Sequence, residues 1–413
     1  TSSGYAPLIV HSHLRWDFVW QRPQQILSRL ARRRAVLYVE EPIFLDDTSV
    51  NTLDVSTVSP GLQRVVPRLR AELRSSYDGA AEAVRMLVRA LIGKSGALAG
   101  QFDRAVQWFY TPMPAPIMIG AFDERGIVYD CMDELSQFRF APPELIDRER
   151  LLISHSDVVF TGGRRLYEAK ARHHSNVHFF GCGVDVDHFA QARDGDTPVA
   201  PELQGLPKPV LGYFGVIDER LDYELIGRLA AEFPQGSIVF VGPIVKVDRN
   251  DLPNAPNIHW LGQRAYTELP AFVKGFDVCL MPFALNAATE FINPTKTLEY
   301  MAAGKPIVST PVPDVVRNFT PIVDVAPAGP EFIHAALMAT RPDPARIEAG
   351  IARAAGATWE TIVAAIDVLV RQAVRDTRPV ETSSDLRPHR QTSVPQTSPR
   401  RTAVRDDGTV HVG

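Results

Sequence analysis

The chain of 413 residues is 45% hydrophobic and 22% charged, and its formal net charge is −4 at pH 7. These values indicate a globular protein long enough for two domains and argue against general nucleic-acid binding. Cys131, Cys182 and Cys279 show neither CxxC spacing nor an even set, so they predict no zinc site, no disulfide framework and a reducing compartment. No apolar run reaches the roughly 18 residues that span a bilayer, and the first residues do not resemble a signal peptide.

The first part of the chain alternates short apolar runs with helical patterns. In chain order, strands are predicted over residues 6–13, 35–42, 104–111, 126–131, 157–162 and 176–181. Helices are predicted over residues 22–33 and 142–156. Apolar strands that alternate with helices indicate a parallel sheet covered on both faces. We therefore predict a first Rossmann-like domain over residues 1–185.

Residues 186–208 are polar and rich in proline, which predicts a linker. A second series follows, with strands predicted over residues 209–215, 237–242, 257–262, 278–283 and 305–310 and helices over residues 222–233 and 267–276. The fold class is therefore α/β, with two doubly wound domains facing across a cleft, the second over residues 209–342. Ligands bind outside the carboxyl ends of the strands in such sheets, so function is expected in the loops that follow strands.

The end of the chain divides into two segments. Residues 343–375 predict terminal helices with a break near Gly356. Residues 376–413 are rich in Ser, Thr, Pro and Arg and lack apolar periodicity, so we expect a disordered tail that is dispensable for fold and activity.

The segment NPTKTLEYMAAGKPIVST, residues 293–310, predicts a loop, a short helix, a glycine stop and a buried strand. Asn293 is expected to cap the helix, and Pro294 suits its first position. At 100° per residue the apolar side is formed by Leu298, Met301 and Ala302, and the side expected to face the cleft by Lys296, Glu299, Tyr300 and Ala303.

Lys296 lies in the first helical turn, where the helix dipole makes a positive charge unfavourable. A bound anion would reverse that effect, because a helix N-terminus after a strand is an anion site. Glu299, one turn further on, can accept two hydrogen bonds from a vicinal diol. A phosphate near Lys296 and a ribose near Glu299 would together suit a nucleotide diphosphate. On spacing alone, a surface Lys–Glu pair worth about 0.2–0.5 kcal/mol stays open as the alternative.

Residues 294–310 resemble the donor-site motif of GT-B glycosyltransferases, especially glycosyltransferase family 4, where a strand ending in Pro precedes P-x-K-x-x-E-Y-M-A-x-G-K-P-V-V. FFGCGVDVDHF, VLGYFG and ATWE resemble the start of the family's linker, the opening of its donor domain and the start of its terminal helix. WQRPQQIL and YDCMDE resemble segments of a bacterial subgroup that makes surface polysaccharides. The resemblance covers about residues 5–372 and implies that residues 343–375 pack back on the first domain.

The resemblance implies a UDP- or GDP-linked sugar as the donor, with no cofactor and no metal. The expected donor-binding residues are Gly215, Asn293, Pro294, Thr295, Lys296, Glu299 and Glu290. Glu299 would bind the ribose, Lys296 and the amides near Asn293 to Thr295 would hold the diphosphate or sugar, and Gly215 would let the backbone approach the phosphates.

Two departures from the family pattern concern the donor site. The family often has a second glutamate eight residues before the position of Glu299, where this chain has Phe291, with Glu290 one position away. The family also often has G-R-x-x-x-x-K-G after the first donor-domain strand, where this chain reads GVIDERLDYE. Arg220 is the candidate substitute for the missing clamp.

HSHLRWDFVWQRP follows the first predicted strand and points to acceptor or phosphate contacts by His13, Arg15, Trp16 and Arg22. A packed loop with paired charges is the alternative. Asp130 and Asp133 follow another strand and could orient an acceptor hydroxyl or act as a base, or they could cap the next helix. We expect Lys296, Asp133 and Arg220 to be catalytic.

Two further patterns suggest other functions. Asp185 and Asp187 form a DxD that could bind a metal, but the start of the linker explains them better. Residues 64–94 contain several basic residues and a helical stripe of Val84, Leu87, Val88 and Leu91. A basic amphipathic surface helix could contact anionic lipid, while ordinary core packing of the stripe is the alternative.

These patterns and the family resemblance predict a cytoplasmic, metal-independent GT-B glycosyltransferase, for which the resemblance implies a retaining mechanism. Peripheral contact at the inner membrane face through residues 64–94 is an open option. The enzyme would move a sugar from a nucleotide-diphosphate sugar to a glycan or lipid-linked acceptor in surface polysaccharide synthesis. A sugar-nucleotide epimerase of similar two-domain build and a degenerate transferase-like binding protein are the alternatives.

Overall fold

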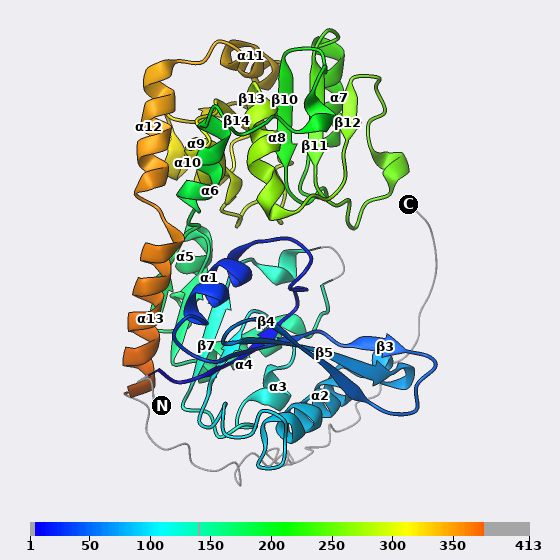
Figure 1. The fold of residues 1–413 in the computed structure, drawn as a ribbon, viewed down its shortest axis with the longest axis vertical. Helices are drawn as coiled ribbons and strands as arrows, with labels where there is room; N and C mark the ends of the chain where they lie inside the picture. Colours follow the sequence, from blue (N-terminus) through cyan, green and yellow to red (C-terminus); the bar gives the residue numbers. More distant parts are fainter. Residues whose placement is uncertain (1–4, 139–140, 376–413) are drawn as a thin grey trace, which may run out of the picture. The chain divides into compact units, whose positions relative to one another are not determined.

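The computed structural model describes residues 5–138 and 141–375 (Figure 1). The tail predicted over residues 376–413 lies outside the described residues. Two sheets organise the described chain, each built mainly from parallel strands with helices on both faces. The predicted α/β class with two Rossmann-like sheets is confirmed.

The first sheet has the strand order β3-β5-β2-β1-β6-β7-β8-β9, with β4 attached to β5. Its strands are β1 (Leu8–Ser12), β2 (Val36–Glu40), β3 (Ile43–Leu45), β4 (Thr52–Ser59), β5 (Leu62–Arg70), β6 (Val106–Phe109), β7 (Gly126–Cys131), β8 (Val158–Thr161) and β9 (Val177–Phe179). Its helices are α1 (Arg22–Leu30), α2 (Tyr77–Ile92), α3 (Ala115–Met118), α4 (Leu145–His155) and α5 (Arg164–Lys170), with 3₁₀ turns η1 (Ala71–Ser75) and η2 (Leu135–Gln137). The central strands β1, β2, β6, β7 and β8 are buried along their whole length, which explains their continuous apolar sequences.

Residues 64–94 do not form one helix, and the helical stripe that the sequence predicted lies on α2. Their first part belongs to β5, which pairs antiparallel with β4 and parallel with β2 and β3. On α2, Val84 and Val88 are buried in the core of the first sheet, and Leu87 and Leu91 pack against it. The apolar stripe is therefore core packing, so it is not free to enter a lipid surface.

The second sheet has the strand order β12-β11-β10-β13-β14-β15, with all strand pairs parallel. Its strands are β10 (Val210–Phe214), β11 (Ser237–Val241), β12 (Ile258–Trp260), β13 (Val278–Met281), β14 (Ile307–Ser309) and β15 (Asp324–Val325). Its helices are α7 (Tyr223–Glu232), α8 (Leu269–Gly275), α9 (Lys296–Ala302), α10 (Pro313–Phe319) and α11 (Pro330–Ala339), with 3₁₀ turns η5 (Arg249–Asp251) and η6 (Tyr266–Glu268).

Part of the predicted linker is folded rather than extended. Residues 186–203 form α6 (Val186–Ala190), η3 (Gln191–Arg193) and η4 (Pro201–Leu203). Phe189 and Leu203 are buried in the core of the second sheet. The segment is polar overall, but a few apolar residues such as Phe189 and Leu203 pack it against the second core.

The terminal helices are α12 (Pro344–Ala355) and α13 (Trp359–Arg375), broken at Gly356 as predicted. They pack on different sheets, so the prediction that residues 343–375 all lie on the first domain is wrong for α12. This helix lies beside α9, and its Ala354 is buried in the second core. By contrast, α13 lies beside α1, and its apolar face completes the core on one side of the first sheet (Figure 1).

The GVD and ATWE segments meet where the chain enters α13. Val184 and Thr358 form a parallel bridge, and the Trp359 ring is buried at 1% exposure. A Cβ on Gly183 would lie 2.9 Å from that ring, so the glycine makes room for the tryptophan. Two sequence motifs 174 positions apart, counted from Val184 to Thr358, thus form one packed junction. In the described part of the chain, none of the helices has the length and apolar character needed to cross a membrane.

Candidate functional site

The short helix α9 begins at Lys296, directly after the loop that follows β13. Its N-cap position is Thr295 and not Asn293, so the predicted capping role of Asn293 is wrong. The Asn293 amide instead donates to the carbonyl oxygen of Gly162 at 3.2 Å, and the Cys182 thiol donates to the Asn293 carbonyl oxygen at 3.0 Å. Asn293 therefore ties the start of α9 to loops that follow strands of the first sheet.

The helix α9 is enclosed on more sides than its amphipathic pattern predicts. Tyr300 is fully buried, and its hydroxyl oxygen accepts a hydrogen bond from the Phe214 amide at 3.0 Å. Ala303 is also buried, so both residues expected to face the cleft are core residues instead. The reason is that α9 packs between the second sheet and α12, which covers the side that the pattern left open.

Lys296 and Glu299 do line a pocket, and they do not form the surface ion pair that the spacing alone allowed. Glu299 is 7% exposed. Among the described residues no ion pair within 4.0 Å involves either side chain, and the Glu299 carboxylate accepts no hydrogen bond from a protein group. Both groups are thus free to contact a ligand.

Aromatic rings and a glycine hold the Lys296 ammonium in place. Its Nζ lies 5.2 Å from the centroid of the Tyr213 ring and 5.6 Å from that of Phe283. Such contacts attract a cation without neutralising its charge. Gly215, at φ +136°, lies against the same side chain, since an added Cβ would be 3.0 Å from Lys296 Cε and 3.1 Å from Nζ. Gly215 therefore leaves room for the lysine as well as for a ligand.

Burial shifts both ionisable groups of this pair toward their neutral forms. It lowers the pKa of Lys296 below its ordinary 10.5, and the nearby Arg220 charge lowers it further. Burial also raises the pKa of Glu299, and the Lys296 charge only partly opposes that rise. A buried cation without a carboxylate partner is unfavourable in the empty protein and would be stabilised by an anionic ligand.

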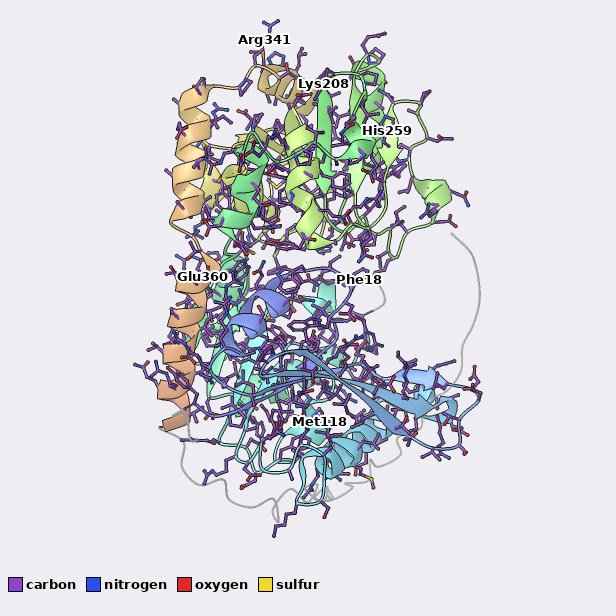
Figure 2. The ribbon with its side chains drawn as sticks, in the orientation of Figure 1. Phe18, Met118, Lys208, His259, Arg341 and Glu360 are labelled. Carbon is purple, nitrogen blue, oxygen red and sulfur yellow. The ribbon has the colours of Figure 1, made fainter. Side chains whose placement is uncertain are left out.

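The pocket has a volume of about 690 Å³ and is lined by loops that follow strands of both sheets. Phe18, labelled in Figure 2, belongs to this lining. The predicted site residues in the lining are Trp16, Arg22, Asp133, Gly215, Arg220, Asn293, Pro294, Thr295, Lys296 and Glu299. We call this space the large pocket.

Arg220 reaches the large pocket beside Lys296, although it is displaced from the family's arginine position. Its guanidinium donates to both carboxylate oxygens of Asp218, at 2.9 Å from Nε and 2.8 Å from Nη2. Asp133 lies across the pocket on the loop after β7. Burial raises the pKa of Asp133, which the Arg220 charge lowers in part. The two residues therefore bring a fixed cation and a carboxyl group to the same space.

The buried Asp130 carboxylate forms an ion pair with the Arg22 guanidinium. The Arg22 Nε donates to Asp130 Oδ1 at 3.0 Å, and Nη1 donates to the Phe180 carbonyl oxygen at 2.8 Å. Asp130 is fully buried and lies outside the pocket lining, so its position contradicts direct contact with an acceptor. It holds Arg22, which is itself only 4% exposed, at the pocket wall.

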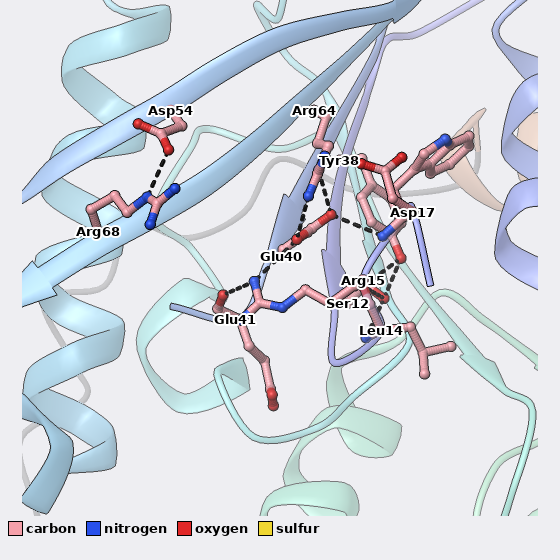
Figure 3. Close-up of polar contacts among 11 residues, drawn as sticks. Ser12, Leu14, Arg15, Asp17, Tyr38, Glu40, Glu41, Asp54, Arg64 and Arg68 are labelled. Atoms are coloured by element: carbon pink, nitrogen blue, oxygen red, sulfur yellow. Dashed lines mark hydrogen bonds and ion pairs between the residues drawn. The ribbon is translucent and has the colours of Figure 1, made fainter. Parts of the chain in front are cut away.

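Arg15 and His13 lie outside the large pocket, contrary to their predicted place on its acceptor side. The Arg15 guanidinium donates to Glu40 Oε2 at 3.0 Å and to the Glu41 carbonyl oxygen (Figure 3). Arg64 shares the same buried Glu40 carboxylate. The alternative, a packed loop with paired charges, therefore describes Arg15. Burial lowers the pKa of His13 to about 4, so this imidazole is neutral.

Trp16 and Glu290 also differ from their predicted surroundings. Trp16 lines the pocket but is only 5% exposed, because its ring packs against the ring of Tyr38 in the core, with the two centroids 5.0 Å apart. Glu290 forms an ion pair with Arg165 and lies outside the lining of the large pocket. Phe291 occupies the position of the family's second glutamate and has no carboxylate. Glu299 is therefore the glutamate of this segment that lines the large pocket.

Several lining residues, among them Tyr266 and Gln263, were not assigned a role from the sequence, whereas Trp20 belongs to the segment predicted to contact an acceptor or phosphate. Trp20 and Tyr266 face each other with ring centroids 5.8 Å apart, and the Gln25 amide donates to the Tyr266 hydroxyl oxygen at 3.1 Å. The Gln263 amide donates to the Phe18 carbonyl oxygen. Gln263 follows β12 at the carboxyl end of the second sheet, so the rule that ligand sites follow strands could have found it.

The predicted DxD does not gather ligands for a metal. Asp185 lies 3.7 Å from Arg29, and Asp187 falls in the first turn of α6. Over residues 5–138 and 141–375, no group of three or more His, Cys, Asp or Glu side chains is arranged to hold a metal ion.

The chain is similar to known proteins in sequence and in fold. The protein TuaH of Bacillus subtilis (strain 168), named as a candidate glycosyltransferase of teichuronic acid biosynthesis, is 26% identical to the chain over 240 residues. The match covers 54% of this chain and 59% of that protein, so the chain matches about three fifths of the relative's length.

Solved structures share the fold along nearly the whole chain. Sucrose-phosphate synthase from Thermosynechococcus elongatus superposes with a TM-score of 0.62 at 16% identity, covering 90% of this chain and 100% of that one. The E. coli trehalose-6-phosphate structure bound with UDP-2-fluoro glucose gives a TM-score of 0.59 at 14% identity, with 91% and 100% covered. At these identities the likeness concerns the fold.

The fold is that of the GT-B glycosyltransferases, as the sequence motifs predicted, and the chain is similar to a relative named for teichuronic acid biosynthesis. More narrowly, residues 209–340 match the family described as Glycosyl transferases group 1. This domain contains the second sheet, α9 and the residues of the second sheet's loops that line the large pocket.

Proposed function

We propose that the protein transfers a sugar from a nucleoside-diphosphate sugar to an acceptor hydroxyl in surface-polysaccharide synthesis. The observation that carries this proposal is the Lys296 ammonium, held against two aromatic rings in the large pocket without a carboxylate partner. Arg220 adds a second fixed cation beside it. Such a pair of cations, at the start of a helix, would suit a diphosphate. The helix lies in the domain that matches the glycosyl transferase family, and the proposed donor carries that group.

The chemistry requires stabilisation of charge on the leaving group. The acceptor oxygen forms a bond to the anomeric carbon, and the bond from that carbon to the diphosphate oxygen breaks with its electron pair leaving on the diphosphate. Lys296 and Arg220 would stabilise the charge that grows on the diphosphate oxygens. Because these cations are already fixed in a largely buried site, little reorganisation is needed as the bond breaks.

Asp133 would receive the acceptor proton or orient the hydroxyl that carries it. Burial raises its pKa, which makes this carboxylate a better proton acceptor than an exposed aspartate. Its loop follows β7, so it approaches the pocket from the first sheet while Lys296 approaches from the second. Arg22, anchored by Asp130, would contact an anionic part of the acceptor.

Four finer features belong to the same proposal. The donor base is uracil or guanine, the reaction retains the configuration of the anomeric carbon, and Lys296 and Arg220 supply the positive charge without a metal. The acceptor is a glycan or a lipid-linked glycan. The E. coli structure bound with UDP-2-fluoro glucose supports a UDP-linked donor, and the resemblance to family 4 supports retention.

The test is to incubate the purified protein with UDP- and GDP-sugars and to separate the products by anion-exchange chromatography. A transferase releases free UDP or GDP, slowly by hydrolysis when no acceptor is present. An epimerase would convert the sugar nucleotide without releasing the free diphosphate. A degenerate binding protein would bind the nucleotide without any turnover. Failure to bind any nucleotide sugar would overturn the proposal.

Replacing Gly215 with alanine should lower nucleotide affinity by about tenfold, because the new methyl group would displace the Lys296 ammonium from its aromatic contacts. The positive φ adds strain of about 1 kcal/mol or more to the empty protein. Titration calorimetry and the melting temperature report the two effects. Gly195→Ala is the matched control, since its added Cβ meets no atom within 4 Å. Full nucleotide affinity in Gly215→Ala would contradict this role.

A further inference from the structure

A second, smaller pocket of about 230 Å³ lies at the carboxyl edge of the first sheet, and the proposed transfer reaction does not use it. It is bordered by the ends of β1 and β2, by β3 and by α2 and α3, where Met118 is labelled in Figure 2. We call it the small pocket. Ligands of doubly wound sheets bind at this edge, so its position is that of a binding site.

The interior of the small pocket is apolar. Its walls include the buried side chains of Val39, Ala80, Ala81, Val84 and Met118. Protein cores leave few voids larger than a water molecule, so an opening of this size is not ordinary packing. It is nevertheless below the roughly 300–1,000 Å³ of a typical small-molecule site, so it would take one part of a ligand rather than the whole.

Of the buried polar side chains that line the small pocket, the Glu40 carboxylate is paired with Arg15 and Arg64, and His11 is uncharged. His11 Nε2 lies 2.8 Å from Gln107 Oε1, and the Gln107 amide donates to the Met118 carbonyl oxygen. Burial lowers the pKa of His11 to about 4, so the imidazole is neutral at physiological pH. A lining whose buried polar groups are paired or neutral favours an apolar group over a charged one.

The rim, in contrast, carries an exposed cation. The Arg74 guanidinium donates a hydrogen bond to the Phe44 carbonyl oxygen. Its central carbon also lies 5.7 Å from the centroid of the Phe44 ring. Within the described residues, Arg74 has no carboxylate within 4.0 Å. The nearby Glu41 carboxylate is engaged by the Tyr77 hydroxyl, which donates to it at 3.2 Å. The rim therefore suits an anionic group next to the apolar interior.

One loop borders both pockets. Ser12 lines the small pocket, while Trp16 and Asp17 line the large one. Arg15 fixes the loop between them through Glu40 and the Glu41 carbonyl oxygen (Figure 3). A ligand with two chemically different parts could therefore lie over a rigid divider, with one part in each pocket.

We propose that the small pocket binds the first part of an alkyl or prenyl chain carried by a phosphate-bearing acceptor. The chain would enter the apolar interior, the phosphate would contact Arg74 at the rim, and the hydroxyl that receives the sugar would lie in the large pocket. The assignment of this ligand as the acceptor rests on the proposed transferase function. The binding of an apolar phosphate ester does not, because it follows from the lining of the small pocket alone.

The test measures binding of geranyl phosphate, geraniol and methyl phosphate to the full chain by titration calorimetry, at concentrations below aggregation of the probes. Geranyl phosphate should bind at least tenfold more tightly than either of the others, because it alone fills the interior and contacts the rim. Ala81→Leu places a larger side chain in the interior and should weaken geranyl phosphate binding by about tenfold or more. Ala90→Leu, at an exposed position of the same helix, is the matched control and should bind normally.

Arg74→Gln provides an independent test, because the side chain is exposed and its loss should not disturb folding. It should weaken geranyl phosphate and leave geraniol unchanged. The proposal is overturned if the parent protein does not prefer geranyl phosphate, if folded Ala81→Leu binds it fully, or if Arg74→Gln has no effect on it. UDP titration separates the two proposals: geranyl phosphate binding without nucleotide-sugar binding supports the small pocket and rejects the transferase function.

Discussion

Replacing Lys296 with glutamine should weaken UDP or GDP binding by about ten- to hundredfold and slow sugar transfer, while the empty protein keeps or slightly gains stability. The loss corresponds to a charge-assisted hydrogen bond of about 1.5–3 kcal/mol. The empty protein should not suffer, because the ammonium is largely buried without a carboxylate partner and its pKa is lowered. The helix dipole opposes it by a further cost of about 0.3–1 kcal/mol.

Melting temperatures of parent and variant, with and without nucleotide, check this prediction. Lys94→Gln, at an exposed position beyond α2, is the matched control. If Lys296→Gln melts lower than the parent when empty and still shows the full nucleotide-induced shift, Lys296 is a structural residue and the phosphate role is wrong.

The same side chain predicts a pH dependence with a defined sign. Since the pKa of Lys296 is lowered, it loses its charge at a pH below 10.5 in the empty protein. Nucleotide affinity should therefore fall as pH rises through that alkaline range. The empty protein should become more stable over the same range, because the unfolded lysine binds its proton more tightly than the folded one. Lys296→Gln should lack both trends. The variant is also the control for titration of the nucleotide itself, which affects parent and variant alike.

Glu299→Ala should weaken nucleotide binding by about tenfold or more and leave the fold intact. Its carboxylate lines the large pocket and accepts no hydrogen bond from the described residues, so a ribose diol is free to donate to it. Burial raises its pKa, which means that the folded empty protein disfavours the charged form. Removing such a group costs little folding free energy, whereas loss of hydrogen bonds to a carboxylate costs about 1.5–3 kcal/mol of binding.

Comparing UDP with its 2′,3′-dideoxy analogue identifies the part of the nucleotide that Glu299 contacts. The parent should lose affinity when the hydroxyls are removed, and Glu299→Ala should bind both compounds equally. Glu348→Ala, on the exposed side of α12, serves as the control. If the hydroxyls contribute as much to the variant as to the parent, the ribose role is removed.

The sequence predicted the buried strands well because parallel strands covered on both faces are continuous apolar runs. It failed for β3, which has only three residues, and for β4 and β5, where polar and apolar residues are mixed. Arg64 and Arg68 read as basic residues of a surface helix, but on β5 they pair with acids of neighbouring segments, among them Glu40 and Asp54. Such pairs depend on strand register, which composition does not contain.

At the site, the sequence identified the residues that lie within one continuous motif. Lys296 and Glu299 are spaced by the helix, so their common place in the pocket follows from local geometry. Tyr300 was misplaced because its burial depends on Phe214 and α12, which lie far away in the sequence. Glu290 was misplaced for a similar reason, since Arg165 of α5 draws it away.

The packing of α13 on the first sheet fixes an order of folding during synthesis. Trp108, Val128 and Phe160 of that sheet share a core with Trp359, Val363 and Ile366, the first apolar residues of α13. A nascent chain that ends before residue 359 therefore lacks one wall of the core that it started to build at residue 8. Domains usually fold as units while the ribosome extends the chain. Here the half made first can bury that face only after the second half has been made.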